Sequence, residues 1–188
     1  MTNHDNYLKV DEYLKVIDNR ILAMIRKPDI LQSCTATILL FFAAVDGLGK
    51  LLHPNPKAKM GERLRSFLDF MGGDYVVRKS QLSNLRNSLM HNAINIDCFM
   101  SQADVNGLQH LTTIPNTNLL YVNTKVLSDD LTNAYNRLRN HLNHDATKLK
   151  RAADRLAWKQ IPDPLECKDS SGQLMGSPPP PIRFIHTK

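Results

Sequence analysis

The longest apolar run in the chain is Ile38-Leu39-Leu40-Phe41-Phe42-Ala43-Ala44-Val45, which Asp46 follows. It lies within a predicted helix over 30–52 that is apolar almost all round, and such a helix normally occupies the centre of a bundle. The run is too short to cross a bilayer, and polar residues interrupt its surroundings. We therefore expect an all-α domain built around this helix, with no membrane partner.

Further helices are expected on both sides of the central one, because apolar residues recur there at helical spacing. Pro28 ends the helix before it, and Asp29 is suited to cap the central helix itself. Ser128, followed by two aspartates, marks the start of the last helix. The outer helices are predicted over 5–27, 57–71, 80–91 and 128–158. Together these patterns predict an up-and-down bundle of about five helices.

Two segments lack the helical period. The first, 97–125, is rich in β-branched residues and asparagines, so we expect an irregular arm with a short hairpin around 114–117. From Ile161 onward the chain is rich in Pro, Gly and Ser, which predicts an extended tail. The chain is therefore expected to divide into a helical domain over 1–160 and a Pro-rich C-terminal tail over 161–188.

Charge and cysteine content narrow the class of protein. The chain has a formal net charge of +6, which favours anionic partners such as nucleic acid. Cys34, Cys98 and Cys167 are far apart and show no metal-ligand spacing, so neither a metal nor a cofactor is expected. Residues 1–20 are polar and lack the apolar core of an export signal, which favours a cytoplasmic protein with reduced thiols.

The stretch whose side chains are best suited to binding and catalysis is Arg86-Asn87-Ser88-Leu89-Met90-His91, at the end of an amphipathic run. Asn87 and His91 are four residues apart, so on a helix they share a face away from the apolar stripe. Arg86 lies on the flank, and its long side chain can reach the same groove. A permanent cation, an amide and a titratable imidazole on one ridge can bind a phosphate and move a proton.

Together with the order of the helices, Arg86, Asn87 and His91 resemble the signature of the HEPN family (higher eukaryotes and prokaryotes nucleotide-binding domain). Members are all-α bundles that carry an Arg, often followed by Asn, and a His a few residues later. The resemblance covers roughly 5–158. It implies a metal-independent endoribonuclease of a prokaryotic toxin or defence system. It also implies a homodimer in which two motifs meet in one cleft.

The resemblance also implies roles for the three residues. His91 would be the general base or acid for attack of a ribose 2′-OH on the adjacent phosphorus. Arg86 would hold the scissile phosphate and offset charge in the transition state. Asn87 would orient His91 or the phosphate, and the product would carry a 2′,3′-cyclic phosphate.

Two other interpretations of the motif stay open. In the first, it is a surface helix end, with Arg86 paired to a nearby acid. In the second, the fold is that of a HEPN domain that binds RNA or nucleotides without cutting, as an accessory module to a nucleotidyltransferase or antitoxin partner. Ala93 stands where some HEPN toxins have a Tyr that such a nucleotidyltransferase modifies, so silencing by that route is not expected.

A second copy of the pattern, Arg139-Asn140-His141-Leu142-Asn143-His144, is predicted to lie in mid-helix. Its usual explanation is a solvated helix surface. The alternative is a track for an RNA backbone, because basic residues outnumber acidic ones over 137–159. The candidate nucleic-acid-binding residues are Arg137, Arg139, Lys148, Lys150 and Arg151.

Two further features receive no functional role. Asp46-Gly47-Leu48-Gly49-Lys50 lacks the full pattern of a phosphate loop, and we interpret it as a helix terminus whose glycines allow close packing. His53, His110 and His186 are isolated in the sequence.

Overall fold

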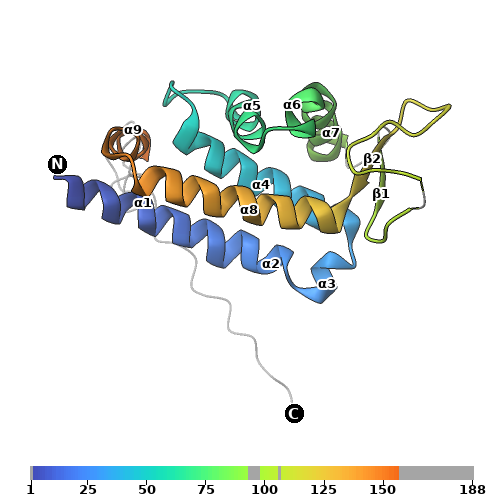
Figure 1. Cartoon of the computed structure of the whole chain (residues 1–188), viewed down its shortest axis with the longest axis horizontal. Helices are drawn as coiled ribbons and strands as arrows, with labels where there is room; N and C mark the ends of the chain where they lie inside the picture. Colours follow the sequence, from blue (N-terminus) through green and yellow to red (C-terminus); the bar gives the residue numbers. More distant parts are fainter. Residues whose placement is uncertain (1, 93–97, 106, 157–188) are drawn as a thin grey trace, which may run out of the picture. The chain divides into compact units, whose positions relative to one another are not determined.

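The structure is a computed structural model that describes residues 2–92, 98–105 and 107–156, with the side chains of Asn3, His91 and Asn92 left aside (Figure 1). The described part is mostly helical and contains one two-stranded sheet, which confirms the all-α class. The tail predicted over 161–188 lies outside the described residues.

The N-terminal helical segment begins at a capping box on Thr2 and occupies the range predicted for the first helix. It consists of α1 (Asn3–Ile17), a π-helical segment (Asp18–Leu22) and α2 (Ala23–Ile25). Pro28 then takes the first position of a short helix, α3 (Pro28–Leu31), where its missing N–H is tolerated.

The central helix, α4, runs over Cys34–Leu52. The predicted cap, Asp29, is wrong, because the Ser33 hydroxyl accepts the Ala36 N–H over 3.3 Å and starts the helix there. Helices α1, α5, α8 and α9 contact α4. Within the described residues α4 alone is long and apolar enough to cross a membrane by length and composition, and half of that stretch is buried in the bundle.

Two helices follow a breaker loop, and the second of them carries Arg86, Asn87 and His91. The first, α5 (Met60–Met71), ends at Gly72 and Gly73, whose φ angles of 79° and 54° favour glycine. A single turn, α6 (Asp74–Val77), leads into α7 (Lys79–Asn92). Both predicted helices are confirmed. The first was predicted over 57–71, and its bounds lie within three residues of those of α5.

The arm between α7 and α8 is more regular than predicted. Strand β1 (Cys98–Ser101) pairs in parallel with β2 (Leu120–Asn123), and Cys98 lies opposite Leu120. The expected short hairpin is confirmed by an antiparallel bridge between Thr113 and Leu120. All four residues of β2 are buried, so this strand lacks the alternation that identifies a strand in sequence.

The long C-terminal helix predicted over 128–158 is two helices, α8 (Thr124–Asn143) and α9 (Ala146–Leu156), whose axes differ clearly in direction (Figure 1). The Asn123 side chain caps α8 by accepting two backbone N–H groups, whereas Ser128 is buried inside the helix. The carboxylate of Asp145 accepts the backbone N–H groups of Thr147 and Lys148 and so caps α9. These caps set the helix boundaries.

Candidate functional site

The motif lies on α7, whose apolar stripe determines which residues face outward. The stripe residues are buried, as predicted: Leu82, Leu85 and Leu89. This orientation leaves Arg86 half-buried on the flank and Asn87 exposed. The backbone of α7 continues to Asn92, so His91 belongs to its last turn. The side chain of His91 lies outside the described residues.

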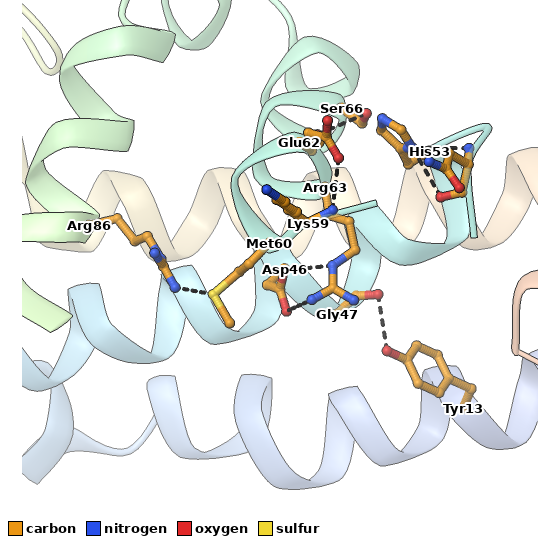
Figure 2. A network of polar contacts seen from close by, with 11 residues as sticks. Tyr13, Asp46, Gly47, His53, Lys59, Met60, Glu62, Arg63, Ser66 and Arg86 are labelled. Atoms are coloured by element: carbon orange, nitrogen blue, oxygen red, sulfur yellow. Dashed lines mark hydrogen bonds and ion pairs between the residues drawn. The ribbon is translucent and has the colours of Figure 1, made fainter. Parts of the chain in front are cut away.

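Arg86 is hydrogen-bonded to its neighbour Asn87. Its Nη1 donates to the Asn87 Oδ1 over 2.8 Å. Its Nη2 contacts the sulfur of Met60, as Figure 2 shows. A guanidinium only donates, so this bond uses the carbonyl oxygen of Asn87 and leaves its NH₂ group able to donate elsewhere. In the part of the chain that the structure describes, no carboxylate forms an ion pair with Arg86.

A cavity of about 220 Å³ adjoins Arg86. Its lining is mostly apolar, and it includes Met60 and Met90, which are 39% and 53% exposed. The carboxylate of Asp46 also lines it, but both its oxygens are bound by Arg63, over 2.9 and 3.1 Å (Figure 2). Burial raises the pKa of Asp46, against the opposing positive charges of Arg63 and Arg86. Asp46 forms its ion pair with Arg63, so it acts on Arg86 only through its charge and without a direct contact in the described residues.

Gly49 explains how Arg63 comes to lie beside Asp46. A Cβ atom on residue 49 would lie 2.0 Å from the carbonyl oxygen of Arg63, so only glycine lets α5 approach α4 this closely. Two residues earlier, the Gly47 carbonyl accepts the Tyr13 hydroxyl of α1 over 3.1 Å (Figure 2). The segment 46–50 is therefore a helix end packed against its neighbours, as predicted.

The second copy of the pattern, over 139–144, has a different environment. Its predicted mid-helix position is wrong, because α8 ends at Asn143 and His144 is the C-cap. Both copies thus lie at helix ends. The Nη2 of Arg139 donates to the Asp11 Oδ1 of α1 over 2.9 Å, and Lys15 also binds Asp11. Lys15, with a smaller effect of Arg139, lowers the pKa of Asp11. The positive charge of Arg139 is therefore balanced by an ion pair with Asp11.

The basic residues of α8 contact different neighbours. Arg137 donates to the carbonyl oxygen of Met71 over 3.0 Å, and its guanidinium lies 5.8 Å from the centre of the Phe70 ring. Arg139 instead contacts α1, through Asp11. Two positions apart on a helix, these arginines point in nearly opposite directions. They do not form one continuous track.

The remaining basic candidates lie on α9, beyond the break after α8. Lys148 forms an ion pair with Asp145 over 3.1 Å, at the start of the helix. Lys150 and Arg151 are exposed. Lys148 and Arg151 line the same hollow, whereas Lys150 does not line it.

A polar cluster that the sequence did not indicate borders a larger cavity, of about 510 Å³. The backbone N–H of Asn123 donates to the His110 Nδ1 over 3.0 Å, so the proton of the neutral ring sits on Nε2. That nitrogen lies 3.1 Å from the Tyr75 hydroxyl, which donates to the Asp130 Oδ2 over 2.9 Å. The chain of bonds ties the arm to α6 and α8.

The environment of this cluster fixes its protonation. Burial lowers the pKa of His110, although the charges of Asp130 and Asp74 oppose that effect. Burial, and then the carboxylate of Asp130, raise the pKa of Tyr75. The imidazole therefore stays neutral and the phenol stays protonated at neutral pH. His110 was not predicted because the arm has no periodicity and its partners are distant in sequence.

No group of three or more His, Cys, Asp or Glu side chains in the described ranges is arranged to hold a metal ion.

Comparisons with protein-family models, with curated proteins and with solved structures give no match. The resemblance to the HEPN family therefore rests on the order of the helices and on Arg86, Asn87 and His91.

Proposed function

We propose that the protein is a HEPN-like, metal-independent endoribonuclease that acts in the cytoplasm as part of a toxin or defence system. One observation carries this choice of site. Of the two Arg-Asn-x-x-x-His copies, the first has an arginine with no carboxylate partner among the described residues, whereas Arg139 is bound by Asp11. A guanidinium that forms no ion pair and borders a cavity can use its donors to bind a phosphate.

The proposed reaction follows from the residues of the ridge. The Arg86 fork and the free NH₂ group of Asn87 bind the two non-bridging oxygens of the scissile phosphate. His91 takes the proton of the ribose 2′-OH, whose oxygen attacks the phosphorus while the 5′-oxygen leaves. The leaving oxygen takes a proton from water, and His91 then releases its own proton to the solvent, so the products are a 2′,3′-cyclic phosphate and a 5′-hydroxyl. The proposed step therefore balances without a metal ion.

The proposed homodimer uses the same face. Met60 and Met90 expose apolar surface beside Arg86, and Ala43 of α4, which lines the same cavity, is exposed as well. Exposed apolar residues around a functional cation favour a partner that covers them. A second copy packed there would bring two motifs toward one phosphate.

The test is cleavage of a labelled single-stranded RNA in the presence of EDTA, with the product ends identified. Wild-type protein is expected to give 2′,3′-cyclic phosphate ends. Arg86→Ala should lower the rate by roughly 10²–10³-fold, because one donor to the developing charge is lost. The control is Arg65→Ala, which removes an exposed arginine of α5 and should leave the rate unchanged.

Two results would count against the proposal. Equal rates for Arg86→Ala and the wild type would remove Arg86 from the reaction. RNA binding with no cyclic-phosphate product in any protein would instead favour a non-catalytic binding or accessory module.

A further inference from the structure

A groove beside α9 holds two arginines close together. Two hollows of about 330 and 210 Å³ are both lined by Arg151 and Arg155, so the two hollows adjoin the same pair of arginines. Pro54 and Pro56 border the first hollow, and Lys148 borders the second. We refer to this feature as the Arg151–Arg155 groove.

Among the described residues, no carboxylate forms an ion pair with the arginines of this groove. Arg155 is held in place because its Nη1 donates to the carbonyl oxygen of Leu51, near the end of α4. Burial and the neighbouring charge of Arg151 both lower the pKa of Arg155. Asp154 lines the groove too, yet in the described ranges no ion pair joins it or any other acid to either arginine.

Two neighbouring cations repel each other unless an anion lies between them. Within the described residues Arg151 is exposed, so a ligand can reach its side chain without rearrangement of the helices. A guanidinium presents a planar pair of donors that matches two phosphate oxygens. A phosphodiester keeps its charge at every physiological pH, which suits two arginines that also keep theirs.

We propose that the Arg151–Arg155 groove binds phosphates in the backbone of an RNA strand, with RNA as the ligand taken from the proposed function. This site replaces a continuous basic track along α8 and α9. Arg137 and Arg139 are directed elsewhere, and Lys150 does not line the groove. Contacts of this kind position the RNA and carry no sequence preference.

The experiment measures RNA affinity in protein that carries His91→Ala, so that cleavage does not interfere. Fluorescence anisotropy of a labelled single-stranded RNA is recorded over a series of KCl concentrations. Arg151→Gln is expected to raise Kd about three- to tenfold at low salt and to reduce the slope of log K against log [salt] by about 0.7. Arg151 is exposed and makes no hydrogen bond that supports the fold among the described residues, unlike Arg155, which holds α9 on α4.

Two further variants sharpen the result. Arg65→Gln makes the same charge change on exposed α5 and should change Kd less than about twofold. Asp154→Asn removes a carboxylate from the groove and should tighten binding about twofold. Opposite effects of neighbouring substitutions would support a local site.

An unchanged Kd in Arg151→Gln, or an equal loss in Arg65→Gln, would overturn the groove as a phosphate site. Absence of RNA binding at low salt would overturn it as well. These outcomes are separate from the cleavage assay. If Arg151→Gln weakens RNA binding but the wild type yields no cyclic phosphate, the groove is supported and the nuclease proposal is contradicted. If the wild type cleaves RNA but Arg151→Gln leaves Kd unchanged, the nuclease proposal is supported and the groove is contradicted.

Discussion

At the scale of single residues, the partner of a side chain decides its role more than the pattern in which it stands. Arg86 and Arg139 begin identical Arg-Asn-x-x-x-His sequences, yet the first binds Asn87 and the second binds Asp11. The pattern could not distinguish them, because Asp11 lies 128 residues from Arg139. Sequence periodicity correctly predicted that Asn87 faces outward. It could not show which of the two arginines forms an ion pair with a carboxylate.

The close approach at Gly49 gives a prediction at the same scale. Gly49→Ala should lower the free energy of unfolding by about 3 kcal/mol, because the new methyl group meets the backbone of Arg63 and α5 must move away from α4. The measurement is urea denaturation followed by circular dichroism. Gly61→Ala is the matched control, since a Cβ there meets nothing within 4 Å, and it should be neutral or slightly stabilising. Equal stabilities of the two variants would contradict the close packing.

At the scale of elements, helix interiors and the ends of α4 and α5 were predictable, whereas most helix starts were not. Apolar spacing located the helices around α4, because each buries one stripe against the core. Their starts depend on which polar side chain reaches the first-turn N–H groups. Ser33 does so in place of Asp29, and Asn123 in place of Ser128. The parallel pair β1–β2 was missed because it joins short segments distant in sequence.

The bonds of His110 make the attachment of the arm dependent on pH. A protonated ring would carry a hydrogen on Nδ1 and could no longer accept the Asn123 N–H. Since the folded pKa lies below the ordinary 6.5, this part of the stability is complete above 6.5 and is lost as the pH falls through the folded pKa. Thermal unfolding from about pH 7.5 to 5.5 should show a smaller loss in His110→Gln than in the wild type. An equal loss in both proteins would assign the pH dependence to other groups.

At the scale of the whole molecule, the fold could be predicted further than the site. The core around α4 follows from one apolar run, and its helical surroundings follow from periodicity. The cluster of Tyr75, His110 and Asp130 joins residues up to 55 positions apart, so no local signal could reveal it. The Arg151–Arg155 groove depends likewise on the break between α8 and α9, which ends the predicted single helix.

The central claim is that the copy of the motif on α7 cuts RNA and the copy at the end of α8 does not. The most direct test is the rate of RNA cleavage in EDTA for His91→Ala beside His144→Ala. The two substitutions are chemically identical and fall on corresponding positions of the two copies. We predict that His91→Ala abolishes the cyclic-phosphate product while His144→Ala cuts at the wild-type rate, with both proteins folded by circular dichroism. Undiminished cleavage by His91→Ala would contradict the account.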